Sequence, residues 1–182
     1  MKRPSVAGLL ALAALAGCAS SGSQPGVTER TVAVADGRVL QANEVRGSDQ
    51  QFDVPATTVW TALRSAYKAM GIEVVVNDPS THRMGNTNFH ASGQWNGKSL
   101  SAYADCGNGP TGPRANNSRV YFSVITTVTA VDGTHTKLST DVRPVAVDMT
   151  GTTNARLDCG TTGELETELY GHVKQALAGG GT

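Results

Sequence analysis

Two long stretches of alternating hydrophobic and polar residues dominate the second half of the chain. Residues 119–131 alternate throughout, and Asp132-Gly133 separates them from residues 137–147, which alternate in the same way. Because successive side chains on a strand point to opposite faces, this pattern predicts a long antiparallel hairpin with one core face and one polar face. Pro144 predicts a bulge or an edge position, since proline cannot donate a ladder hydrogen bond. The expected core face of the first strand comprises Val120, Phe122, Val124, Thr126, Val128 and Ala130.

Two other segments have the hydrophobic period of an amphipathic helix. The first spans residues 56–70, and Gly71 is placed to end it in a left-handed conformation. The second follows Thr161, which forms a capping-box pattern with Glu164 three residues later. The expected buried stripes are Val59, Trp60, Leu63, Ala66, Tyr67 and Met70 on the first helix, and Leu165, Leu169, Val173 and Ala176 on the second, with His172 at its border.

Shorter β-prone segments complete the pattern. Asp36-Gly37 between residues 31–35 and 38–42 predicts a hairpin, because a type I′ turn needs positive φ at both central positions. Residues 108–117 are rich in turn formers and predict a loop. Further strands are expected at residues 51–54, 72–76, 84–91, 100–104 and 154–159. This order predicts the α+β class, with an antiparallel sheet of about five to seven strands and two helices packed on one face.

The N-terminal residues have the layout of an export signal, with a basic start at Lys2 and Arg3, a short apolar run and then small residues. The end of this run, Leu15-Ala16-Gly17-Cys18, resembles the lipobox of bacterial lipoproteins. The resemblance implies cleavage before Cys18, diacylation of its sulfur and, in many bacteria, a third chain on its amine. The alternative is an ordinary signal peptide with a chance cysteine.

The same resemblance implies a cellular location. Ala19 is not the aspartate that commonly retains lipoproteins in the inner membrane. We therefore expect an anchor in the periplasmic leaflet of the outer membrane, with the outer face of the cytoplasmic membrane as the alternative. No second apolar stretch approaches the length of a membrane span, so attachment would depend on two or more acyl chains at Cys18.

This interpretation divides the chain into four parts. Residues 1–17 would be the signal peptide, 18–30 a lipidated flexible tether, 31–178 a single α+β domain and 179–182 a flexible tail. Removing the signal peptide from the 182-residue chain leaves 165 residues, enough for one domain with a sizeable core. It also leaves 13 of the 15 basic residues against 15 acidic ones. A net charge so close to zero does not favour nucleic acid as a partner.

Two cysteines remain after the lipidated one, Cys106 and Cys159. In an oxidising compartment, such a leftover pair predicts a disulfide, which would close a loop of 53 residues. A metal site with two cysteine ligands is the alternative. It would need further ligands, and the four histidines, His82, His90, His135 and His172, have no ligand-type spacing with either cysteine. No metal or other cofactor is therefore expected.

Several residue combinations suggest chemistry and have simpler interpretations. Trp60 and Tyr67 are candidates to stack a ligand, although aromatic residues seven apart on an apolar helix face usually belong to the core. Residues 108–117 contain two glycines but lack the Lys-Ser/Thr ending of a phosphate loop. Asp105 and Asp158 precede the two cysteines and would point away from the bridge rather than form a catalytic pair. We do not expect an enzyme.

The order of elements, with helix entry at Val54-Pro55 and exit at Gly71-Ile72, is similar to helix-grip domains such as those found in a lipoprotein component of the β-barrel assembly machinery. It also resembles bacterial lipoproteins with paired Asp-Cys-Gly segments, and neither resemblance transfers a functional residue. Two hypotheses follow. The first is a non-enzymatic interaction or scaffold module that binds another envelope protein. The second is a carrier or sensor of a small apolar ligand bound between helices and sheet, which would need a cavity of roughly 300 Å³ or more.

Overall fold

The computed structural model describes residues 27–33, 39–45, 48–149 and 156–179, the first two ranges as backbone alone. The predictions for the signal peptide, Cys18, most of the tether, the Asp36-Gly37 turn and residues 180–182 lie outside the described residues. The elements are β1 (Val27–Ala33), β2 (Val39–Val45), β3 (Ser48–Phe52), α1 (Ala56–Ala69), β4 (Val76–Asp78), β5 (Arg83–Ser92), β6 (Gln94–Trp95), β7 (Lys98–Ser99), the 3-10 helix η1 (Leu100–Ala102), β8 (Ala104–Asp105), β9 (Asn108–Gly109), β10 (Gly112–Pro113), the 3-10 helix η2 (Arg114–Asn117), β11 (Ser118–Ala130), β12 (Thr136–Asp148), β13 (Arg156–Asp158), β14 (Gly160–Thr161) and α2 (Glu164–Gly179).

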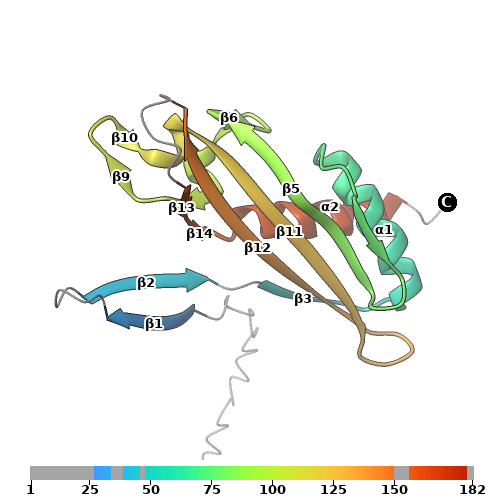
Figure 1. Ribbon diagram of the computed structural model, residues 1–182. Coiled ribbons are helices and arrows are strands. Elements are labelled where there is room, and N and C mark those ends of the chain that lie inside the picture. Colours follow the sequence, from blue (N-terminus) through green and yellow to red (C-terminus); the bar gives the residue numbers. More distant parts are fainter. Residues whose placement is uncertain (1–26, 34–38, 46–47, 150–155, 180–182) are drawn as a thin grey trace, which may run out of the picture.

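The long hairpin predicted from the alternating residues forms the centre of the main sheet (Figure 1). β11 and β12 pair antiparallel in continuous register from Ser118 opposite Asp148 to Ala130 opposite Thr136. The strand order is β13-β12-β11-β5-β6-β7, with β3 on the outer side of β12 and β4 on the outer side of β5. The alternation of buried and more exposed residues along β11 confirms the predicted faces from Val120 to Val128, whereas Ala130, also predicted for the core face, is exposed.

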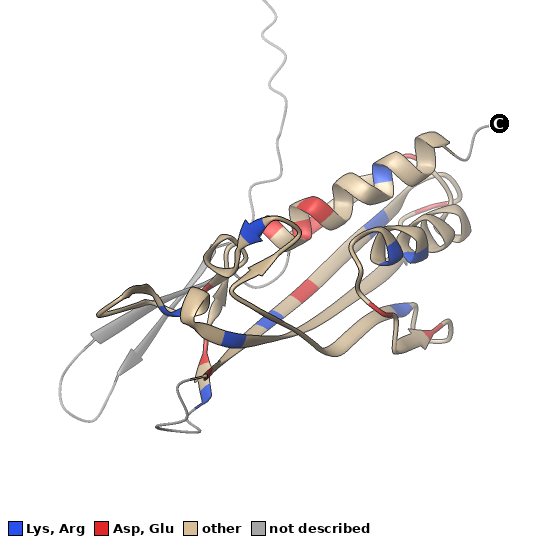
Figure 2. Cartoon of the chain, turned by 90° about the horizontal axis from the view of Figure 1, so that it is seen from above, with Lys and Arg blue, Asp and Glu red and all other residues tan. Residues whose placement is uncertain are grey.

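Both helices cover the same face of this sheet, which Figure 2 shows from above. α1 packs beside α2, and the two helices lie against β11 and β12 respectively. The fold is therefore α+β, with a mostly antiparallel sheet and two helices on one side, as predicted. The largest fully buried side chains include Leu63, Tyr67, Met70, Ile72, Met84, Leu100, Tyr103, Phe122, Leu138, Leu165 and Leu169.

α1 ends where the sequence predicts. Gly71 has φ of 70°, and its N–H donates to the Lys68 carbonyl at 3.0 Å. The N–H of Ile72 donates to the Tyr67 carbonyl, also at 3.0 Å, which completes a Schellman motif. This closure brings Ile72 back into the core, where only 2% of its surface is exposed.

Pro144 lies at an edge position, in agreement with its prediction. β3 pairs with residues 136–140 of β12 and β13 pairs with residues 145–147, so Pro144 falls in the gap between them. The Pro144 carbonyl accepts a hydrogen bond from the Cys159 N–H at 3.0 Å. In an antiparallel strand, the nitrogen and the carbonyl of one residue face the same side. The Pro144 carbonyl faces the β13 side, so its ring nitrogen also points away from β11, and the missing N–H costs the β11–β12 ladder no hydrogen bond.

Three local predictions were wrong. Residues 72–75 are not a strand, because their first part closes α1. The Val75 N–H donates to the Gly85 carbonyl of β5, and the paired strand β4 begins at Val76. Residues 100–104 form η1 and the start of β8 instead of a continuous strand. Thr161 does not cap α2, since its hydroxyl donates to the Glu166 carboxylate and Thr162 accepts the Glu164 N–H at 3.3 Å.

Candidate functional site

The predicted disulfide is present. Cys106 and Cys159 are joined with an S–S distance of 2.00 Å. Cys106 follows β8 and Cys159 precedes β14, and these two short strands pair with each other through Asp105 opposite Gly160. The bridge therefore fastens the segment that leads into α2 to the end of its neighbouring strand, β8. Asp105 and Asp158 are both exposed, and the Asp105 carboxylate accepts the Gly107 N–H at 2.9 Å.

Tyr67, one of the two candidate ligand-stacking residues, is part of the core. Its ring is fully buried, and its hydroxyl lies 2.8 Å from the Thr126 hydroxyl and donates to the Met84 carbonyl at 3.3 Å. The Thr126 hydroxyl lies 3.0 Å from that of Thr140, and the Tyr170 hydroxyl of α2 donates to the Ser48 carbonyl of β3. Burial raises the pKa of the Tyr67 phenol above its usual value. These hydroxyls join α1 to β11 and β12, and α2 to β3.

Trp60, the other candidate, faces a different environment. It is half-buried and lines an open pocket of about 240 Å³. The other lining residues are Ala56, Thr57, Pro79, His82 and Val128. The structure thus separates the two aromatic residues, because Tyr67 points into the layer between helix and sheet while Trp60 reaches the surface near the start of α1.

Glu166 is a buried acid that the sequence pattern did not reveal. None of its surface is exposed, and its carboxylate accepts hydrogen bonds from the Thr161 hydroxyl at 3.0 and 3.1 Å. Desolvation by burial raises the pKa of this carboxyl. The residue stands one position after Leu165, and the apolar stripe predicted for this helix does not include it.

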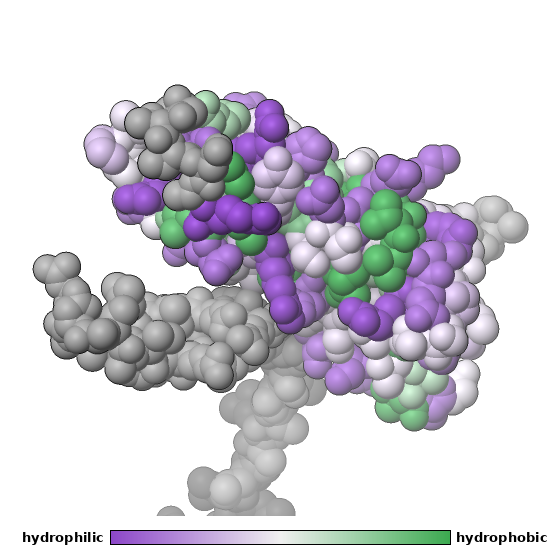
Figure 3. All heavy atoms as spheres, in the orientation of Figure 1, coloured by the Kyte–Doolittle hydropathy of each residue, from purple (hydrophilic) through white to green (hydrophobic). Residues whose placement is uncertain are grey.

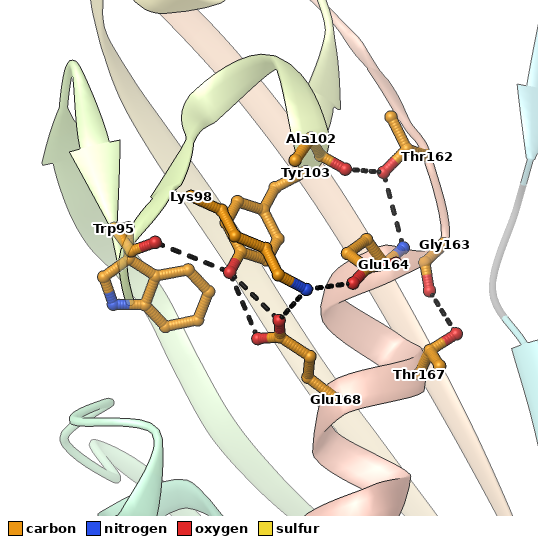
Figure 4. A network of polar contacts seen from close by, with 9 residues as sticks. All are labelled: Trp95, Lys98, Ala102, Tyr103, Thr162, Gly163, Glu164, Thr167 and Glu168. Carbon is orange, nitrogen blue, oxygen red and sulfur yellow. Dashed lines mark hydrogen bonds and ion pairs between the residues drawn. The ribbon is translucent and has the colours of Figure 1, made fainter.

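A second polar cluster holds the start of α2 against the β6–β7 hairpin (Figure 4). The Lys98 ammonium pairs with Glu164 and lies 2.7 Å from Glu168. The Tyr103 hydroxyl is 3.2 Å from both oxygens of Glu168, and burial together with this carboxylate raises the pKa of Tyr103 to about 12. Each charged or hydroxyl group of the cluster forms a hydrogen bond or an ion pair with another group in it, so the role of the cluster is to position α2.

The face of the sheet opposite the helices carries a groove of about 640 Å³. Its side chains come from β3, β5, β11 and β12, and Figure 3 shows this face, with hydrophilic and neutral residues along its middle. Two ion pairs lie within or beside it, Arg143 with Asp141 at 2.8 Å and Lys137 with Asp49 at 3.3 Å. The groove is lined by Asp49, Arg83, Thr87, Ser123, Ile125, Thr127, Ser139, Thr140, Asp141 and Arg143.

This arrangement suits recognition through hydrogen bonds and paired charges. Hydroxyl groups line the groove together with Asp and Arg side chains, and Ile125 contributes apolar surface. In the described part of the chain, no three His, Cys, Asp or Glu side chains are grouped so that they could hold a metal ion. Neither described helix combines the length and apolar character that crossing a bilayer requires. Comparison of the sequence with models of protein families and with curated proteins finds no match.

Proposed function

We propose that the protein is a membrane-anchored envelope lipoprotein whose folded domain is a non-enzymatic interaction module, with another envelope protein as its partner. Acyl chains on Cys18 would hold it in the periplasmic leaflet of the outer membrane. The open face of the sheet is the proposed docking surface. The support for the anchor is the lipobox-like sequence that ends at Cys18.

The observation that carries the interaction role is the face of the main sheet that neither described helix covers. β11 and β12 are each 13 residues long, and both helices lie on the other side. Arg83 and Arg143 line the groove together with Asp49 and Asp141, so it offers both signs of charge. Paired charges favour a protein partner with complementary polar side chains over a polyanion such as nucleic acid.

The core gives less support to the alternative of a carrier for a small apolar ligand. The place where such a ligand would lie, beneath α1, is filled by the Tyr67 ring and its partners Thr126 and Met84. The pocket beside Trp60, at about 240 Å³, is smaller than the roughly 300–1,000 Å³ of most small-molecule sites. We therefore favour the interaction module.

The anchor is tested by Cys18→Ser in the native host, followed by fractionation. We expect the wild-type protein in the membrane fraction and the variant in the soluble fraction, because the substituted residue cannot be acylated. Persistence of the variant in the membrane fraction would show that Cys18 is not the anchor.

The docking surface is tested by photocrosslinking in intact cells. A photoreactive residue at Thr127 or Ser139, on the open face, should give a discrete crosslinked band that mass spectrometry identifies as an envelope protein. The same residue at Lys174 or Gln175, on α2, serves as the matched control. Equal crosslinking from both faces, or none from the open face, would refute the proposed surface.

A further inference from the structure

One end of the domain gathers three segments that are far apart in the sequence. The start of α1, the turn between β4 and β5 and the β11–β12 hairpin meet there, at the lower right of Figure 1. The pocket beside Trp60 lies among them, lined by residues of all three. Its lining is mainly apolar, with Ala56, Pro79 and Val128 around the half-buried indole. Val131, at the tip of the hairpin, adds a side chain that is 58% exposed.

Each of the three segments also carries a carboxylate. Asp78 immediately precedes Pro79, Asp53 lies just before α1, and Asp132 is in the hairpin loop. Asp53 is 88% exposed and Asp132 is 53% exposed. Arg83 stands opposite Asp78 in the strand register, but its side chain lines the groove on the open face of the sheet.

Local hydrogen bonds keep two of these acids ionised. The Asp78 carboxylate accepts from the N–H and hydroxyl groups of Ser80 and Thr81. The Asp132 carboxylate accepts from the Thr134 N–H at 2.7 Å and from the His135 N–H and ring. These bonds hold the pKa of both carboxyls well below the usual range. The other ring nitrogen of His135 is 3.8 Å from Asp53, so His135 lies between two carboxylates.

We infer that this end of the domain binds a basic segment of a partner protein, which inserts one apolar side chain beside Trp60 and places Lys or Arg side chains near Asp53, Asp78 and Asp132. The pocket, at about 240 Å³, falls below the size of most small-molecule sites, whereas interface anchors are single aromatic or aliphatic side chains in small pockets. The surrounding negative charge selects a cationic segment over an acidic peptide or a fatty acid. The inference rests on the proposed interaction role but concerns a different surface from the open sheet face.

The test uses the full chain carrying Cys18→Ser and three capped peptides of equal length. One combines a central Phe with four Lys, one replaces that Phe by Ser, and one combines the Phe with four Glu. Binding is followed by the indole N–H signals of Trp60 and Trp95 in NMR spectra, with Trp95 as the internal control. We expect the basic Phe peptide to shift the Trp60 signal in a saturable way, the Ser peptide to bind more weakly, and the acidic peptide not to bind.

Charge variants then separate this site from general attraction to the protein. Asp53→Asn and Asp132→Asn should each weaken binding of the basic Phe peptide by about two- to fivefold at low salt, the effect of one exposed ion pair. Asp158→Asn, exposed on β13 outside this end of the domain, is the matched control and should not change it. Added salt should weaken binding to the wild type more than to the variants.

Four outcomes would overturn the inference. The first two are no shift of the Trp60 signal at millimolar basic Phe peptide, and shifts of equal size with the basic and the acidic Phe peptides. The other two are a Trp60 shift with decanoate equal to that with the basic peptide, and a Trp60 shift that depends on protein concentration in the absence of peptide. The last two would identify a fatty acid or a second copy of the chain as the occupant. Because this measurement concerns the Trp60 pocket alone, it can fail while crosslinking from the open sheet face succeeds, and the reverse also holds.

Discussion

Loss of the Cys106–Cys159 bridge should lower the stability of the domain by an amount that follows from its position in the chain. The two cysteines are 53 residues apart. In the chain-entropy model, closing a loop of that length stabilises the folded state by about 4 kcal/mol, because the unfolded chain loses conformational freedom. At about 2–4 °C per kcal/mol for a protein of this size, the midpoint of thermal unfolding should fall by roughly 8–16 °C.

The measurement is urea unfolding of the wild type with and without reductant, beside the double variant Cys106→Ala, Cys159→Ala. The reduced wild type and the variant should lose similar stability, because Cys106 is buried but Cys159 is only half-buried and little packing is removed. The hydrogen bonds between β8 and β14 remain available in the variant. A loss below about 1 kcal/mol would show that the unfolded chain is already compact in this region and would refute the loop-entropy reasoning.

Two further substitutions test the polar groups of the core. Tyr67→Phe removes a hydroxyl that contacts Thr126 and the Met84 carbonyl, and should lower the free energy of unfolding in urea by about 1–2 kcal/mol. Thr61→Ala, on the exposed side of α1, is the control. An unchanged stability of Tyr67→Phe would show that these hydrogen bonds contribute nothing. Burial raises the pKa of Glu166 in the folded protein. The wild type should therefore lose stability as the pH rises from the ordinary glutamate pKa near 4.5 through the raised pKa, because in this range the unfolded chain binds fewer protons than the folded protein. Glu166→Gln cannot ionise and should flatten this part of the pH profile, whereas parallel profiles for the two proteins would contradict the assignment.

The sequence determined the elements whose signal is local. The alternation along β11 and β12 and the apolar stripes of α1 and α2 repeat over ten or more residues, and each places its hydrophobic side chains on one face whatever the rest of the chain does. Gly71 is also a local signal, because the end of α1 requires a positive φ. The pairing of Cys106 with Cys159 could be predicted because the lipobox resemblance left two cysteines and an oxidising compartment.

Only the tertiary structure decided which side chains meet. Residues 72–75 have the composition of a strand, but closure of α1 draws Ile72 into the core, and backbone hydrogen bonding to β5 begins only at Val75. Glu166 is buried because the β14 segment with Thr161 lies over its side of α2, and no periodicity in the helix reports that neighbour. Trp60 and Tyr67 share one stripe in the sequence, yet Tyr67 is completely buried while Trp60, one turn from the start of α1, lines a pocket with residues of the β4–β5 turn and β11. Contacts between distant segments depend on how whole elements pack, and this information is not present in any short stretch of the chain.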